Sequence, residues 1–401
     1  MFESLEMTHP DPILTLSEHF MNDTNPRKVD LGIGLYKDKY GDTPVMESVR
    51  IAESFVVDSA MDKIYKGSSG LDGFCDVISW LLFRERSSLI ENGRVLSIQT
   101  IGGTGAVRLA AEFLKQIDPD KGVWVSDPTW GNHIDIFLHL GMKVSCYPYQ
   151  SGGGGLNFPI MLESIRKIPE GDVIILHGCG HNPTGYDLSK CQWHAVLEVV
   201  KERGLFPVID MAYHGLANGL CDDIYCVELF SDHLDEMFVA YSCSKNFGLY
   251  RDRVGALVVL GKNRDSCVKA KLHLSRLARV SISSPAIHGA LIVSEILSSP
   301  ELNRVWVEEL SRMSLRVKFA RGMLIKEACK QGCDDAFRNV SNGVGLFSLI
   351  PVGREDVDVL REEFCIYMLD SGRINLSGVN DDNVGYIVSS IKALLGKQGG
   401  V

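Results

Sequence analysis

The chain has 401 residues, enough for one large domain or two of ordinary size. Hydrophobic residues make up 45% and charged residues 23%, which is typical of a soluble globular protein, and no apolar run is long enough to cross a membrane. The formal charge of −10 argues against nucleic acid, or an anionic membrane, as the main partner.

The cysteines also limit the possible classes. There are 11, scattered without the paired spacing of a metal site, which indicates reduced thiols in an intracellular protein. The first residues are acidic and lack the apolar core of a signal peptide. We therefore expect a cytoplasmic protein without a metal site.

The first part of the chain alternates short apolar patterns with polar turns. Asp11–Phe20 has a proline where the first turn of a helix allows one, then apolar residues at helical spacing. Residues 29–36 are expected to form a strand in which Gly32 and Gly34 let a ligand approach the backbone, although a simple glycine kink explains them equally well. A helix is expected over 47–61.

A glycine-rich turn, Gly102-Gly103-Thr104-Gly105, opens the next expected helix, whose apolar residues recur on one face from Ala106 to Ile117. A helix N-terminus offers free N–H groups and the positive end of the helix dipole, which suits a phosphate. The turn matches neither a Walker loop nor a dinucleotide fingerprint, so an ordinary helix start is the alternative interpretation.

Apolar runs then alternate with helical patterns, which indicates a mostly parallel sheet. These runs are 123–126, 143–149, 172–177, 207–210, 238–241 and 254–260. Residues 152–155 are expected to form a flexible hairpin or a surface loop. From about residue 290 the pattern changes to long helices and then to shorter elements, which predicts a second, smaller domain.

The loop Ser242–Gly255 joins two of the predicted buried strands. It contains Lys245 together with hydroxyls and the arginines Arg251 and Arg253. A lysine in such a loop can be a Schiff-base nucleophile, and hydroxyls with an arginine suit a phosphate. Taken alone, the loop is equally compatible with a solvated turn.

Polar residues also follow other predicted strands. Trp130, Asn182, and Asp210 with Tyr213 each come after an apolar run, as Lys245 does. The carboxyl ends of parallel strands meet at one crevice, so these side chains are expected to share a site. An indole, an amide, a carboxylate, a phenol and a lysine suit an aromatic cofactor with a ring nitrogen, a hydroxyl and an aldehyde, such as pyridoxal phosphate.

In this order the motifs resemble the class I pyridoxal-phosphate aminotransferases, most of all the aspartate and aromatic aminotransferase subgroup. The matching segments are Val29–Lys37, Gly102–Ala106, Trp124–His133, His177–Gly185, Asp210–Gly215, Ser242–Gly255 and Ser371–Leu376. The resemblance implies the α/β architecture of fold type I. That architecture has a large domain with a mostly parallel seven-stranded sheet between helices and a smaller α/β domain. The expected divisions are an N-terminal arm at 1–12, a small domain at 13–45 and 315–401, and a large cofactor-binding domain at 46–314.

The resemblance also implies roles at the cofactor. Lys245 would form an aldimine with pyridoxal phosphate and then move protons, while Asp210 would pair with the protonated ring nitrogen. Asn182 and Tyr213 would hydrogen-bond the ring hydroxyl oxygen, and Trp130 would stack on the ring. The residues that would hold the phosphate are Gly103, Thr104, Ser242, Ser244 and Arg253, with Tyr65 reaching across from a partner subunit.

For the substrate, the resemblance implies that Arg373 clamps the α-carboxylate beside the backbone of Gly34, with Trp130 and Asn182 nearby. Arg279 would enter the neighbouring subunit's site and pair the distal carboxylate, so substrates would be dicarboxylic. The stretch after it, Ser281–Ala286, departs from the family pattern, and Arg276 could compete for the role.

Three histidines lie where the family has residues that support the ring-binding aspartate. They are His133, His177 and His181. A structural role and a functional role are equally open for each of them.

The expected function is that of an aspartate aminotransferase. It would act by a ping-pong reaction between L-aspartate and 2-oxoglutarate, giving oxaloacetate and L-glutamate, in a homodimer with shared sites and with the N-terminal arm across the partner. An aromatic or broad-range aminotransferase is the alternative within the subgroup. A non-catalytic binding protein on this fold is the other class, and it would be expected to lack the lysine or the ring aspartate.

Overall fold

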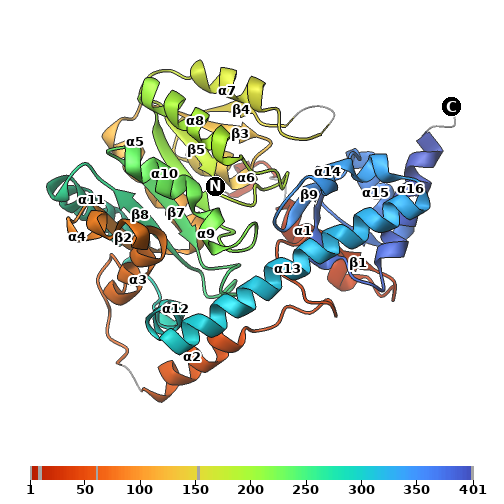
Figure 1. Ribbon diagram of the computed structural model, residues 1–401, viewed down its shortest axis with the longest axis horizontal. Helices are drawn as coiled ribbons and strands as arrows, with labels where there is room; N and C mark the ends of the chain where they lie inside the picture. Colours follow the sequence, from red (N-terminus) through yellow and green to blue (C-terminus); the bar gives the residue numbers. More distant parts are fainter. Residues whose placement is uncertain (1, 8–10, 60–61, 151–153, 399–401) are drawn as a thin grey trace. The chain divides into compact units, whose positions relative to one another are not determined.

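The computed structural model describes residues 2–7, 11–59, 62–150 and 154–398 (Figure 1). Contacts divide the chain into two compact units, one of Met1–Thr43 with Arg316–Val401 and the other of Pro44–Leu315. Residues 1 and 8–10 of the expected arm, and residues 152 and 153 of the expected surface loop, lie outside the described residues.

The second unit is built on a seven-stranded sheet with strand order β2-β8-β7-β6-β5-β3-β4. Strand β8 is antiparallel to both its neighbours, and the remaining pairs are parallel. The strands are β2 (Val95–Ile101), β3 (Gly122–Asp127), β4 (Lys143–Pro148), β5 (Val173–His177), β6 (Phe206–Met211), β7 (Met237–Ser242) and β8 (Val254–Leu260). The mostly parallel seven-stranded sheet of the predicted fold class is therefore confirmed.

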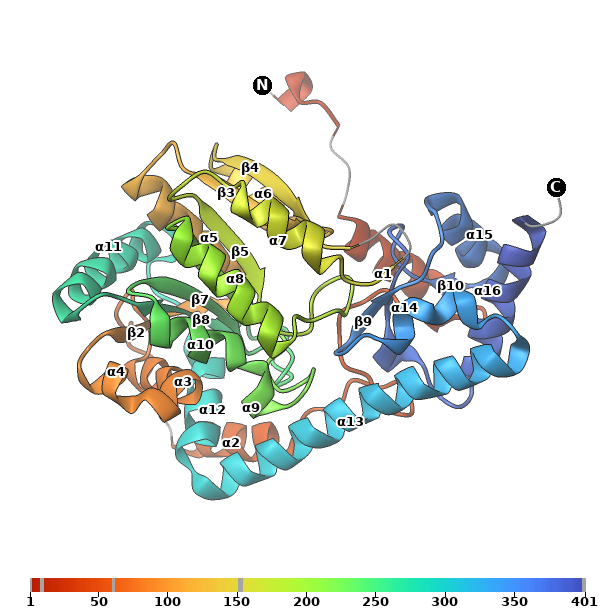
Figure 2. The same cartoon turned by 45° about the horizontal axis from the view of Figure 1, so that its top comes forward.

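Strands β7 and β8 are buried along their whole length, as expected for strands covered on both faces. Helices α5 (Gly102–Ile117), α6 (Gly131–His139) and α11 (Arg264–Ile282) pack one face, where Leu109, Phe137 and Leu274 join the core. Helices α8 (Lys190–Glu202) and α10 (Tyr225–His233) cover the opposite face (Figures 1 and 2).

The other helical elements of this unit connect the strands or flank the sheet. They are α2 (Glu47–Asp58), α3 (Asp72–Phe83), η2 (Arg84–Arg86), α4 (Ser87–Glu91), α7 (Phe158–Arg166), α9 (Leu220–Asp223) and α12 (His288–Ser298).

Strand β2 was not predicted from the sequence, because its buried positions include polar residues. Ser97 and Gln99 are both almost fully buried. Their polar groups have partners: the Ser97 and Ser79 hydroxyls lie 2.7 Å apart, and the Gln99 amide nitrogen donates to the Ala286 carbonyl at 2.8 Å. These hydrogen bonds offset the free-energy cost of burying polar groups. Their partners come from distant parts of the chain, so a local sequence pattern does not reveal them.

The first unit contains two small sheets. In one, β1 (Val29–Asp30) pairs in parallel with β10 (Ile366–Tyr367), and in the other β9 (Phe347–Leu349) pairs antiparallel with β11 (Arg373–Asn375). The helical elements are η1 (Phe2–Ser4), α1 (Pro12–Asn22), η3 (Asp334–Phe337), α14 (Arg338–Ser341), α15 (Arg354–Phe364), η4 (Leu376–Gly378) and α16 (Val384–Gln398). Helix α13 (Pro300–Gln331) begins in the second unit and ends in the first.

The strand expected over residues 29–36 is shorter than predicted, since β1 ends at Asp30. Beyond it, the Asn375 side-chain nitrogen donates to the carbonyls of Ile33 and Leu35, both at 2.6 Å. A side chain from β11 thus satisfies backbone groups that a strand partner would otherwise bind.

Within the described residues, no helix is both long enough and apolar enough to cross a lipid bilayer.

Candidate active site

One cavity of the second unit is formed by residues at the carboxyl ends of the parallel strands and at the start of α5. Its lining residues are Gly103, Thr104, Trp130, His177, Asn182, Asp210, Ala212, Tyr213, Ser242, Ser244, Lys245 and Arg253. All except His177 and Ala212 were predicted to bind the cofactor, so the fold brings that set together. Lys245 is half-buried, and its Nζ lies 5.0 Å from the centre of the Tyr213 ring.

Asp210 is the buried acid of this cavity. Its carboxylate accepts a hydrogen bond from His133 Nε2 at 3.0 Å. Burial alone would raise the pKa of Asp210. The hydrogen bond from His133 and the electrostatic attraction of nearby groups such as Lys245 outweigh that effect, so the pKa of Asp210 lies below its usual value. The carboxylate is therefore charged at neutral pH and can hold a proton on a facing nitrogen.

A chain of hydrogen bonds runs from Asp210 to the loop that carries Asn182. His133 Nδ1 lies 2.9 Å from the Thr129 hydroxyl, which lies 3.1 Å from His177 Nε2. The Asn182 backbone N–H donates to His177 Nδ1 at 3.4 Å. Burial lowers the pKa of His177 to about 3, so its ring is neutral, and the donors and acceptors then alternate along the whole chain.

His133 and His177 therefore connect Asp210 to the backbone of Asn182. Thr129, which the sequence did not single out, is the link between them. His181 instead bonds the hydroxyls of Ser126 and Thr184, at 3.0 and 2.9 Å, and stacks on Tyr149.

The start of α5 offers donors to an anion. Gly102 has φ +65° and donates its N–H to the Arg253 carbonyl at 2.9 Å, and a Cβ at Gly102 would lie 2.7 Å from Arg253 Nη2. A Cβ at Gly103 would lie 2.9 Å from the Cβ of Ser242. The Ser244 hydroxyl accepts from Arg253 Nη1 at 3.3 Å and from Ser242 at 3.2 Å. A helix N-terminus, two hydroxyls and a guanidinium together suit a phosphate.

The two residues predicted to bind the α-carboxylate, Gly34 and Arg373, lie in the first unit. Arg373 is buried on β11 and donates to the Gly32 carbonyl at 2.7 Å. Its guanidinium lies 4.3 Å from the centre of the Phe347 ring, and a Cβ at Gly34 would lie 3.2 Å from the same ring. The structure therefore places Gly34 and Arg373 next to the same ring, that of Phe347.

Tyr65 and Arg279 belong to the second unit but do not line the cavity. Tyr65 is 89% exposed. Arg279 is exposed near the end of α11, where its Nη1 donates to the Ser283 hydroxyl at 2.6 Å. Arg276 is exposed on the same helix.

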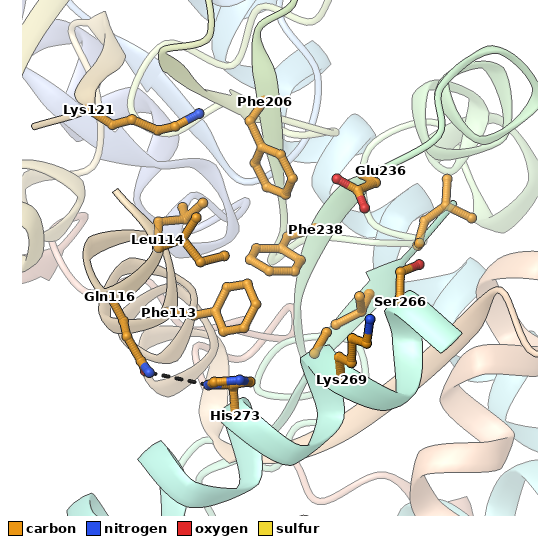
Figure 3. Close-up of a pocket in the computed structure, with 15 residues that line it drawn as sticks. Phe113, Leu114, Gln116, Lys121, Phe206, Glu236, Phe238, Ser266, Lys269 and His273 are labelled. Atoms are coloured by element: carbon orange, nitrogen blue, oxygen red, sulfur yellow. Dashed lines mark hydrogen bonds between the residues drawn. The ribbon is translucent and has the colours of Figure 1, made fainter. Parts of the chain in front are cut away.

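A larger cavity, of about 510 Å³, contains none of the predicted residues (Figure 3). Phe113, Phe206 and Phe238 line it with edge-to-face ring contacts, and a hydrogen bond of 3.2 Å joins Gln116 to His273 at its side. Phe206 begins β6 and Phe238 lies near the beginning of β7, whereas Asp210 and Ser242 lie near the other ends of these strands. Cavity size therefore does not identify the reactive site here.

Comparison with known proteins identifies the family of the chain. Residues 26–391 match the model of the family "Aminotransferase class I and II". An aromatic-amino-acid aminotransferase from Pseudomonas aeruginosa is 42% identical over 370 residues, covering 92% of this chain and 93% of its own length. An aspartate aminotransferase from Haemophilus influenzae is 38% identical over 396 residues, covering 98% of this chain and 100% of its own.

A solved structure with the same fold is the aromatic-amino-acid aminotransferase from Burkholderia pseudomallei, covalently bound to pyridoxal phosphate. It superposes with a TM-score of 0.95 at 38% identity, covering 98% of this chain and 99% of that one. The chain belongs to the class I and II aminotransferases, in their aspartate and aromatic aminotransferase subgroup.

Proposed function

We propose that this pyridoxal-phosphate-dependent aminotransferase transfers the amino group of L-aspartate to 2-oxoglutarate, giving oxaloacetate and L-glutamate. The observation that carries its aminotransferase chemistry is the single cavity in which Lys245, a charged Asp210 and the anion-binding start of α5 meet. A binding protein without catalysis would have no need of both the lysine and the buried carboxylate.

The residues of the cavity fit the cofactor. Pyridoxal phosphate, when bound, supplies an aldehyde that condenses with amines and a protonated ring that withdraws electrons. The donors around Gly103, Thr104, Ser242, Ser244 and Arg253 would hold its phosphate. Asp210 would hold the ring nitrogen, Asn182 and Tyr213 the ring oxygen, and Trp130 one ring face.

Each reactive side chain then has one task. Lys245 would carry a proton between carbon atoms of the substrate and cofactor, as its half-buried amine lies beside Tyr213. Asp210 would keep the ring nitrogen protonated, because its low pKa makes it an anion at neutral pH. Tyr213 would orient the ring by donating to its oxygen.

Dicarboxylate selectivity would rest on two arginines. Arg373 would bind the α-carboxylate beside Gly34, and the buried stacking of its guanidinium on Phe347 supports a fixed orientation. Arg279 would bind the distal carboxylate from a second subunit, which accords with its exposure on α11.

We further propose a homodimer, in which Tyr65 and Arg279 complete the partner's site and the N-terminal arm lies across the partner. Within each chain, the unit of Pro44–Leu315 would be the cofactor-binding domain. The other unit, with Gly34 and Arg373, would be the small domain, which closes over the bound substrate.

An aromatic or broad-range aminotransferase is the second candidate, favoured by the Pseudomonas aeruginosa relative at 42% identity. The two functions are separated by kcat/KM for aspartate, tyrosine and phenylalanine with 2-oxoglutarate as acceptor. We expect aspartate to give the highest value, since an arginine that meets a carboxylate in a water-poor site gains a charged hydrogen-bonded pair. A clear preference for tyrosine or phenylalanine would assign the aromatic function instead.

A further inference from the structure

The two residues that would handle the cofactor's ring oxygen and its reactive carbon, Tyr213 and Lys245, are on different loops. Tyr213 follows β6 and Lys245 follows β7, and these strands pair in parallel with Met211 opposite Tyr241. Beyond the strand ends, ladder hydrogen bonds no longer set the distance between the loops. Side chains that join the loops can set it instead.

A chain of three buried side chains makes that connection. His214 directly follows Tyr213, and Asn246 directly follows Lys245. The Tyr241 hydroxyl lies between them, 3.0 Å from His214 Nδ1 and 2.8 Å from Asn246 Nδ2. His214, Tyr241 and Asn246 are each at most 1% exposed.

The hydrogen bonds of this chain can run in only one direction. His214 Nε2 must donate to the Leu220 carbonyl, 2.9 Å away, because a carbonyl only accepts. Burial lowers the pKa of His214 to about 4, so the neutral ring leaves Nδ1 as an acceptor for the Tyr241 hydroxyl. The Tyr241 oxygen in turn accepts from the Asn246 amide. A chain with one possible direction holds its members in one arrangement.

Both ends of this hydrogen-bonded chain of side chains are held by further contacts within the same unit. The Trp306 indole donates to the Asn246 carbonyl at 2.8 Å, and its ring stacks on Phe247. At the other end, the Asp223 carboxyl group accepts from the backbone N–H groups of Gly215, Ala217 and Asn218. These hydrogen bonds therefore fix the position of one loop relative to the other.

We propose that His214, Tyr241 and Asn246 are positioning residues that set Lys245 against Tyr213. The proposal rests on the cofactor roles given above to these two residues, and it concerns no contact between the three side chains and the cofactor. Loss of the Tyr241 hydroxyl should let the loops separate and weaken the hydrogen bond from Tyr213 to the ring oxygen.

The test uses the holoenzyme of Tyr241→Phe, which keeps the ring and removes the hydroxyl. Without substrate, the cofactor absorbance is titrated to find the pH at which the Lys245 nitrogen, joined to the cofactor, loses its proton. A weaker donor from Tyr213 leaves more negative charge on the ring oxygen, which holds that proton more tightly. We expect the midpoint to rise by roughly half a unit or more, and kcat/KM to fall by about tenfold.

Tyr147→Phe is the matched control. Tyr147 is also fully buried, but its hydroxyl donates to the Ile175 carbonyl at 2.8 Å and so joins neither the loop of Tyr213 nor that of Lys245. Both variants should lower Tm by similar amounts, whereas only Tyr241→Phe should move the absorbance midpoint. An unchanged midpoint in Tyr241→Phe, with Tm lowered as in the control, overturns the proposal.

A second pair of variants keeps the test decisive if Tyr241→Phe does not fold. His214→Gln retains an acceptor and a donor, whereas His214→Leu retains neither. We expect the midpoint of His214→Gln to stay near the parent value and that of His214→Leu to rise, and equal midpoints in the two count against the proposal. Because no amino acid is present in the titration, a wrong substrate assignment would leave this result unaffected.

Discussion

At the scale of single residues, the site depends on histidines that burial keeps neutral. A charged His177 could not accept the Asn182 N–H, and a charged His214 could not accept the Tyr241 hydroxyl. Burial is the main cause in both cases, and it lowers the pKa of His177 to about 3 and that of His214 to about 4. Neutral rings make these hydrogen-bond chains possible. Protonation of the rings at low pH therefore lowers the free energy of unfolding.

We predict that the free energy of unfolding falls as the pH is lowered from 7 to 5. The folded pKa of His177 lies below the unfolded value of about 6.5, so the unfolded chain binds more protons below that pH. The resulting loss from His177 is about 2 kcal/mol at pH 5. Denaturant titrations of the holoenzyme at both pH values, with cofactor in excess, measure the free energy of unfolding.

The variant His177→Gln removes this titrating group, so its loss of stability between pH 7 and pH 5 should be smaller by about 2 kcal/mol. His139→Gln, which changes a histidine exposed on α6, serves as the control and should retain the parental pH dependence. The same pH dependence in His177→Gln as in the parent would contradict the prediction.

At the scale of elements, the proposed phosphate site at the start of α5 depends on glycine, which has no side chain. Gly102 lies where its φ of +65° favours glycine, and the Arg253 guanidinium occupies the space that a Cβ would take. The glycine therefore matters both for the backbone conformation and for the position of Arg253.

We predict that Gly102→Ala weakens the binding of pyridoxal phosphate by about tenfold, equivalent to about 1.4 kcal/mol. The added Cβ meets Arg253 Nη2 at 2.7 Å and strains the backbone. Spectroscopic titration of the apo-protein with the cofactor measures the Kd.

The chain offers a matched control in Gly131→Ala at the start of α6. A Cβ at Gly131 meets no atom within 4 Å, so this variant should bind the cofactor with the parental affinity. If the two alanine variants bind equally well, the start of α5 has no special role in holding the phosphate.

At the scale of the whole molecule, we predict that two inactive variants regain activity when they form mixed dimers, which a monomeric enzyme could not do. Mixed dimers would contain one Lys245→Ala chain and one Arg279→Asp chain. If Arg279 serves the partner's site, each mixed dimer has one site with both changes and one with neither. Random exchange of the two inactive parents should then restore about one quarter of the parental activity toward aspartate.

The readout is the rate of aspartate turnover after the parents are mixed under conditions that exchange subunits. Arg276→Asp changes another exposed arginine of α11 and is the control: it should be active before mixing, and exchange with Lys245→Ala should add no activity. Activity that stays at the level of the separate parents would rule out a shared site built with Arg279.

The sequence by itself determined the fold class, the family and the residue types of the candidate site. These conclusions depend on local patterns: apolar runs such as Val173–His177 form buried strands, and the polar residues after them meet where parallel strands end. The carboxylate and the lysine are recognisable because each follows such a run, and the glycine-rich turn because it opens a helix with an apolar face. The structure places the residues predicted to bind the cofactor, from Gly103 to Arg253, around one cavity.

Only the tertiary structure decided which polar groups are paired inside the protein. Strand β2, the short β1, the link of Thr129 between two histidines and the chain through Tyr241 all depend on partners distant in sequence. A hydroxyl or an imidazole looks the same in a sequence whether it faces water or a buried acceptor. Its pKa and its role follow from burial and from the one neighbour that folding brings within hydrogen-bond distance.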